Sequence, residues 1–136
     1  MTPEQIALVQ HSFADVAPHM TQAARLFYAH IFELDPSLRA RFPVDMREQE
    51  RKLMLTLDVA IASLDRLEEF VPMVYALGKR HANYGTQPRD YETLQHALIW
   101  MLGEILGESF TEETREAWNT IYSFLVETML VAATPV

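Results

Sequence analysis

The chain has 136 residues, of which 49% are hydrophobic, and its formal net charge is −8. This length suits one hydrophobic core, so we expect a single domain over residues 1–136. The acidic balance disfavours a nucleic-acid partner, and the absence of cysteine excludes disulfides and thiolate metal sites. The sequence shows no secretory signal and no apolar run of the roughly 18 residues that a membrane span needs. We therefore expect a cytoplasmic protein with no membrane partner.

The first half of the chain predicts helices separated by prolines. Thr2 and Gln5 have the spacing of a capping box, and apolar residues then recur at helical spacing. Pro36 is expected to open a short helix. Asp45 is expected to cap the next helix, with Glu48 in the capping-box position.

The second half continues in the same way. Pro72 either kinks or restarts a helix that Gly85 is expected to end, and a further helix is predicted from about residue 89 to residue 106. Ser109 or Thr111 would cap the last helix. No segment of any length alternates with period two, so we predict an all-α fold of six to eight helices. The varied apolar spacing favours crossed helices over a coiled-coil bundle.

A histidine late in the helix that contains Pro72 has an unusual setting. Leu77 and Gly78 lie four and three residues before His81, so the three share one helix face. An imidazole beside a leucine and a glycine can meet a flat apolar group. Taken alone, however, a histidine near a helix end is more often a packed or surface side chain.

The order of landmarks along the whole chain resembles a globin. It is most similar to the bacterial single-domain globins related to the haem domain of flavohaemoglobins. The landmarks are Leu26-Phe27-Tyr28, Pro36, Phe42, Gln49, Leu53, His81, Tyr91, Trp118 and Tyr122. The resemblance implies a globin fold that encloses one haem b (iron protoporphyrin IX).

The resemblance also implies a role for residues on both sides of the haem. His81 would be the axial iron ligand on the proximal side, with Leu77 and Gly78 against the porphyrin. Phe42 would stack on the porphyrin from the distal side. The candidate cations for contact with the haem propionates are Lys52, Arg51 and either Lys79 or Arg80.

On the distal side, Tyr28, Gln49 and Leu53 would face the sixth coordination position. Bound oxygen carries partial negative charge, so a phenol O–H and an amide N–H are suitable donors. Two such bonds, each worth about 1 kcal/mol, would slow ligand escape about 10- to 100-fold. Without the resemblance, Tyr28 is an ordinary core tyrosine and Gln49 a solvated helix residue. The histidines that match no ligand position are His11, His19, His30 and His96.

The proximal side departs from the flavohaemoglobin pattern, in which the axial histidine cooperates with a tyrosine and a late glutamate. Tyr91 matches the tyrosine, but the glutamate position, counted from Trp118, falls on Ala133. A carboxylate partner raises the basicity of an imidazole. Its loss argues against peroxidase-like activity.

The first functional hypothesis is reversible oxygen binding, for storage, delivery or scavenging, although distal donors of this kind also suit nitric oxide dioxygenation. The alternatives are a nitric oxide dioxygenase that works with a separate reductase and a haem-based gas sensor. The expected partners are oxygen, carbon monoxide and nitric oxide, with an external reductase for the enzyme alternative. The chain would act as a monomer or a homodimer.

Overall fold

The computed structural model describes residues 1–83 and 86–133, and all regular structure within them is helical. The α-helices are α1 (Pro3–Val16), α2 (Met20–Leu34), α3 (Arg47–Ala62), α4 (Leu67–Asn83), α5 (Pro88–Leu106) and α6 (Glu112–Ala133). Three short 3₁₀ helices join them: η1 (Ala17–His19), η2 (Pro36–Arg41) and η3 (Gly107–Ser109). The predicted all-α class is confirmed.

Several helix starts follow from local capping. The Thr2 hydroxyl accepts a bond from the Gln5 N–H at 3.1 Å, while the Gln5 side chain accepts one from the Thr2 N–H at 2.9 Å. Asp35 caps η2 by accepting from the Ser37 N–H at 3.1 Å. Thr111 caps α6, since its hydroxyl accepts from a backbone N–H in the first turn at 3.2 Å. These caps satisfy N–H groups that helix starts leave unpaired.

Other boundaries differ from the sequence prediction. Asp45 does not cap α3, whose N-cap is Met46. The Asp45 carboxylate instead accepts from the backbone N–H of Arg47 and pairs with the Arg47 guanidinium, so local bonding of the Asx-turn kind displaces the cap. Pro72 lies inside α4, which runs through it as one helix. Gly85 lies outside the described residues, so its predicted role as a helix end stays a prediction.

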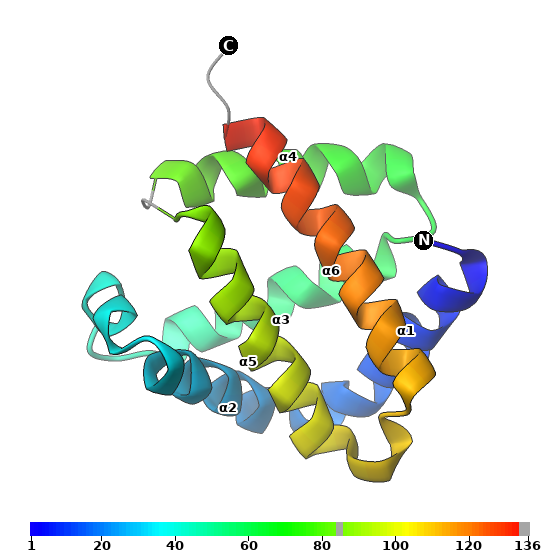
Figure 1. Cartoon of the computed structure of the whole chain (residues 1–136), viewed down its shortest axis with the longest axis horizontal. Coiled ribbons are helices and arrows are strands. Elements are labelled where there is room, and N and C mark those ends of the chain that lie inside the picture. The colour runs from blue at the N-terminus through cyan, green and yellow to red at the C-terminus, as the bar shows by residue number, and fades with distance from the viewer. Residues whose placement is uncertain (84–85, 134–136) are drawn as a thin grey trace.

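The helices cross one another in different directions rather than running in parallel (Figure 1). The most extensive helix contacts join α4 to α6, α2 to α5, and α1 to α6. The crossed arrangement agrees with the prediction from the apolar spacing. Within residues 1–83 and 86–133, no helix has the length and hydropathy that crossing a membrane requires.

Candidate functional site

The interior contains a largely apolar cavity of about 200 Å³, which we call the apolar cavity. Its wall is formed by Phe27, Lys52, Leu53, Thr56, Leu57, Ala60, Ile61, Leu64, Phe70, Leu77, His81, Tyr91, Leu94, Leu98, Trp118, Ile121, Tyr122, Leu125 and Met129. These residues come mainly from α3, α4, α5 and α6. Among the described residues, His81 is the one histidine in this wall.

His81 is held by its own helix. Its Nδ1 lies 2.9 Å from the carbonyl oxygen of Leu77, one turn earlier on α4. When Nδ1–H donates to this carbonyl, the neutral ring carries its lone pair on Nε2. Burial lowers the pKa of His81, the bond to Leu77 opposes that shift, and the charge of Arg80 adds to it. The neutral form, which is the one that binds a metal, is therefore favoured at neutral pH.

Two tyrosines complete the wall beside His81. The ring of Tyr91 lies 6.2 Å from the His81 ring, centroid to centroid, with the planes at 30°. The Tyr122 hydroxyl donates to the Tyr91 carbonyl oxygen at 2.6 Å, which ties α6 to the start of α5. Burial raises the pKa of both tyrosines. Both hydroxyls therefore keep their protons at neutral pH.

Tyr28 and Gln49 form a bonded pair between α2 and α3. The Gln49 amide Nε2–H donates to the Tyr28 hydroxyl at 3.0 Å. Burial raises the pKa of Tyr28, the bond from Gln49 lowers it, and the charge of Glu50 adds to the rise. A hydroxyl that accepts one bond can still donate its own hydrogen. Tyr28 is therefore a protonated donor whose oxygen is anchored by Gln49.

The residues predicted for the site fall into two groups. Those that line the apolar cavity are Lys52, Leu53, Leu77, His81 and Tyr91. Within the described chain, those outside its wall are Tyr28, Gln49 and Phe42. Ring contacts connect part of this second group to the wall: the Tyr28 ring is 5.2 Å from that of Phe27, which lines the cavity, and 5.5 Å from that of Phe42. The predicted contacts of these three residues with a bound group stay predictions.

The cations predicted to meet the haem propionates have different surroundings in the structure. Lys52 lines the cavity wall. Arg51 forms an ion pair with Glu48 on its own helix, and the Lys79 ammonium lies 5.1 Å from the centroid of the Tyr75 ring. The arrangement therefore favours Lys52 over these other two cations.

Gly78 does not face the apolar cavity, and the prediction that it does is wrong. A Cβ atom built on Gly78 would lie 2.5 Å from the carbonyl oxygen of Met129 and 2.6 Å from its Cα. Gly78 thus faces the main chain of α6, which leaves no room for a side chain. Sequence reasoning missed this contact, although a glycine inside a helix is unfavourable enough to indicate a packing reason.

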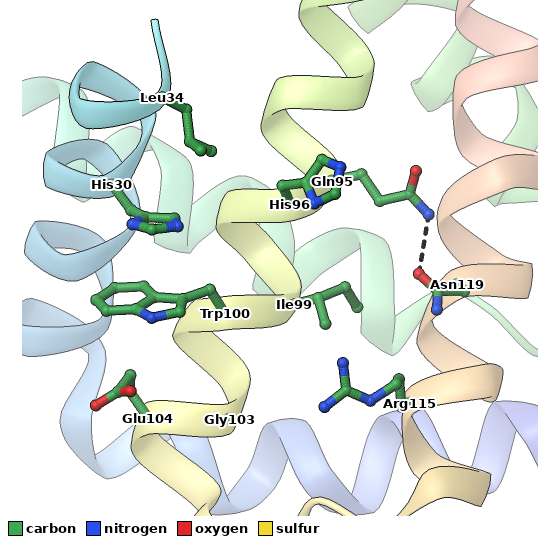
Figure 2. Close-up of a pocket in the computed structure, with 10 residues that line it drawn as sticks. All are labelled: His30, Leu34, Gln95, His96, Ile99, Trp100, Gly103, Glu104, Arg115 and Asn119. Atoms are coloured by element: carbon green, nitrogen blue, oxygen red, sulfur yellow. Dashed lines mark hydrogen bonds between the residues drawn. The ribbon is translucent and has the colours of Figure 1, made fainter.

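A second, wider hollow lies on another face of α5 and is lined by side chains of α2, α5 and α6 (Figure 2). We call it the polar trough. The His30 and Trp100 rings stack in it, 4.2 Å apart and tilted by 12°, and the Gln95 amide donates to Asn119 at 2.9 Å. Its volume of about 620 Å³ exceeds that of the apolar cavity. Among the described residues no group of three metal-binding side chains forms, there or elsewhere.

The donor set, rather than the volume, decides which hollow is the candidate site. The apolar cavity pairs a half-buried imidazole, whose pKa is lowered by burial, with apolar side chains, whereas the polar trough is lined largely by side chains that water solvates well. A sequence model of the Globin family matches residues 25–129, a range that contains both sides of the apolar cavity. The chain belongs to the globin family.

Similar proteins support this assignment. The neuroglobins of Danio rerio and Tetraodon nigroviridis are each 26% identical to this globin over 136 residues, covering 90% of it and 86% of the relative. A solved structure described as a hexacoordinated heme protein from an anhydrobiotic tardigrade at pH 4 matches with a TM-score of 0.88 and 15% identity. The match covers 98% of this globin and 95% of that chain. At this identity the match shows the fold alone, and the predicted globin fold is confirmed.

A haem is the group that the family implies, and the residues of the apolar cavity fit it. A porphyrin needs apolar side chains against its faces and one axial donor for the iron. The cavity wall contains residues that can meet both needs. The apolar side chains include Leu53 and Leu57 on α3 and Leu77 on α4, and the imidazole of His81 can act as the axial donor. Lys52, the one Lys or Arg among the described residues of the wall, can meet an anionic edge.

Proposed function

We propose that this globin binds haem b through Nε2 of His81 and uses it to bind molecular oxygen reversibly. When bound, the haem supplies a ferrous iron that takes up a diatomic gas. The observation that carries the proposal is the position of the His81 imidazole, which lies in a wall of apolar side chains with its Nδ1 2.9 Å from the Leu77 carbonyl oxygen.

On the proximal side, the Leu77 carbonyl orients the His81 ring. A backbone carbonyl is a neutral acceptor, so it draws the Nδ1 proton less strongly than a carboxylate does. The imidazole then keeps ordinary basicity. This favours ligand binding over bond-breaking chemistry such as peroxidase activity.

On the distal side, Tyr28 is proposed to donate to the bound gas and Gln49 to anchor Tyr28. The bond between them directs the amide hydrogen to the phenol oxygen and leaves the phenol hydrogen for another acceptor. Oxygen accepts hydrogen bonds better than carbon monoxide, so this pair would retain oxygen selectively. Because Tyr28 is outside the cavity wall and its ring packs against that of Phe27, which lines the wall, its approach to the gas is proposed to require a local side-chain adjustment when the haem binds.

The sixth coordination position is proposed to stay open to gas. The tardigrade protein is described as hexacoordinated, which requires a second axial donor. The two histidines in the polar trough, His30 and His96, lie outside the cavity wall. With Gln49 at the predicted distal position, this globin is proposed to be five-coordinate when ferrous.

Spectra and rapid mixing test the function. The purified ferrous holoprotein should show a five-coordinate spectrum, shift on adding carbon monoxide, and release oxygen slowly in stopped-flow displacement. A six-coordinate ferrous spectrum that resists carbon monoxide would contradict the proposal.

Two further experiments test the alternative functions, nitric oxide dioxygenation and gas sensing. Sustained nitric oxide consumption in the presence of an added reductase would favour the dioxygenase role. A ligand-dependent response of a purified partner would favour sensing. Slow oxygen release without either of these effects would favour oxygen storage or delivery.

A further inference from the structure

The helix that carries His81 is placed almost entirely by α6. Among the described residues, α4 packs far more extensively on α6 than on any other helix. Figure 1 shows α6, coloured orange to red, crossing α4. The contact has two anchors: the Phe70 and Phe124 rings stack 5.9 Å apart near the start of α4, and Gly78 meets Met129 near its end.

The second anchor is a contact between main chains. A Cβ on Gly78 would lie 2.5, 2.6 and 2.9 Å from three main-chain atoms of Met129, whereas ordinary van der Waals contact begins at about 3.4 Å. Because these atoms belong to the helix backbone, no change of a side-chain rotamer can relieve the overlap. Any larger residue at position 78 must move α4 away from α6.

This anchor lies close to the proposed iron ligand. His81 follows Gly78 by three positions, which is about 4.5 Å along the helix axis. Leu77, next to Gly78 in the chain, holds the His81 ring through its carbonyl. Both Leu77 and Met129 line the apolar cavity. A displacement of α4 at Gly78 is therefore passed to the imidazole.

We infer that Gly78 is a positioning residue for the proximal ligand. By allowing α4 to touch the main chain of α6, it sets how far into the apolar cavity His81 reaches. The inference rests on the proposed role of His81 as the iron ligand.

Gly78→Ala tests the inference, with Gly103→Ala as a matched control. Gly103 also lies inside a helix, but a Cβ there would meet only a side-chain carbon of Phe110, at 3.8 Å. In ferrous holoprotein, Gly78→Ala should lower or abolish the iron–histidine stretching band seen by resonance Raman. It should also speed haem loss about 10- to 100-fold, the range typical of disturbed ligand positioning. Gly103→Ala should leave both unchanged.

The Gly78→Ala substitution in a second variant, His81→Gly, distinguishes a positioning role of Gly78 from general damage to the cavity. In His81→Gly with free imidazole, the axial ligand is not attached to α4. Gly78→Ala should then leave the iron–imidazole band of this adduct unchanged. The inference would be overturned if Gly78→Ala shifted the iron–ligand band equally for the attached histidine and for free imidazole. It would also be overturned if Gly78→Ala shifted neither band.

The spectrum of His81→Gly distinguishes failure of the proposed function from failure of the inference about Gly78. If His81→Gly kept the wild-type ferrous spectrum, the ligand assignment itself would be wrong, whatever Gly78→Ala does. Circular dichroism checks folding, and Gly103→Ala supplies a more stable background for Gly78→Ala because it removes an unfavourable helix glycine. A Gly78→Ala chain that does not fold even there would show that the crossing serves folding alone, which would also overturn the inference.

Discussion

The two sides of the apolar cavity are held by different kinds of contact. On the side of α2 and α3, a side chain bonds to a side chain, since Gln49 donates to Tyr28. On the side of α4, a side chain bonds to the main chain of its own helix, and one main chain packs on another. The first arrangement can be tuned by single substitutions. The second depends on where whole helices lie, so we expect it to tolerate change less.

The largest effect is expected on the proximal side, from His81→Gly. Removal of the one imidazole in the described wall should abolish tight ferrous haem binding, and free imidazole should restore the spectrum. Optical titration with haem measures both. His96→Gly, which changes an exposed histidine of the polar trough, is the control and should behave as wild type. Equal haem affinity in His81→Gly and wild type would show that the proximal side does not supply the iron ligand through His81, and the expected difference between the proximal and distal sides would be wrong.

Tyr28→Phe should produce the largest distal effect. The substitution would remove the proposed hydrogen bond from Tyr28 to the bound gas, worth about 1 kcal/mol, so oxygen should dissociate roughly fivefold faster. Carbon monoxide dissociation should change less, because carbon monoxide is the poorer acceptor. Stopped-flow displacement measures both rates. An unchanged oxygen rate would show that the Tyr28 hydroxyl does not reach the gas.

Gln49→Leu should have a smaller effect, because Gln49 is proposed to act by anchoring Tyr28. We expect an increase in oxygen dissociation of about twofold to threefold, and no further increase when Gln49→Leu is added to Tyr28→Phe. The double-mutant cycle from the same stopped-flow rates gives the coupling. Fully additive effects would show that Gln49 bonds to the gas independently.

The smallest effect is expected from Ala133→Glu at the last residue of α6. The related pattern has a glutamate here, and a carboxylate that reached His81 would raise the basicity of the imidazole. We expect a modest upward shift of the iron–histidine band and a small gain in peroxidase activity, with Ala133→Gln as the uncharged control. No difference between the two variants would show that a carboxylate at this position does not act on His81.

The sequence predicted side-chain features better than main-chain contacts. Helical spacing and the Thr2–Gln5 capping box are local, so both were predictable, and both are confirmed. The Gly78 contact joins two helices that are distant in sequence, so a glycine inside a helix indicates a close approach without identifying Met129 as its partner. Asp45 was wrongly predicted as a cap because Arg47 competes for the same carboxylate. The polar trough was not predicted, since His30 and Trp100 meet only after α2 packs on α5.

The iron–histidine stretching band of the ferrous wild-type protein tests the central claim most directly. The account predicts that the band is present, shifts when histidine is labelled with ¹⁵N, and lies at the lower frequency of an imidazole bonded to a neutral acceptor. A missing band would contradict His81 as the ligand of a five-coordinate iron. A band at the high frequency typical of a carboxylate-supported histidine would contradict the proximal arrangement built on the Leu77 carbonyl.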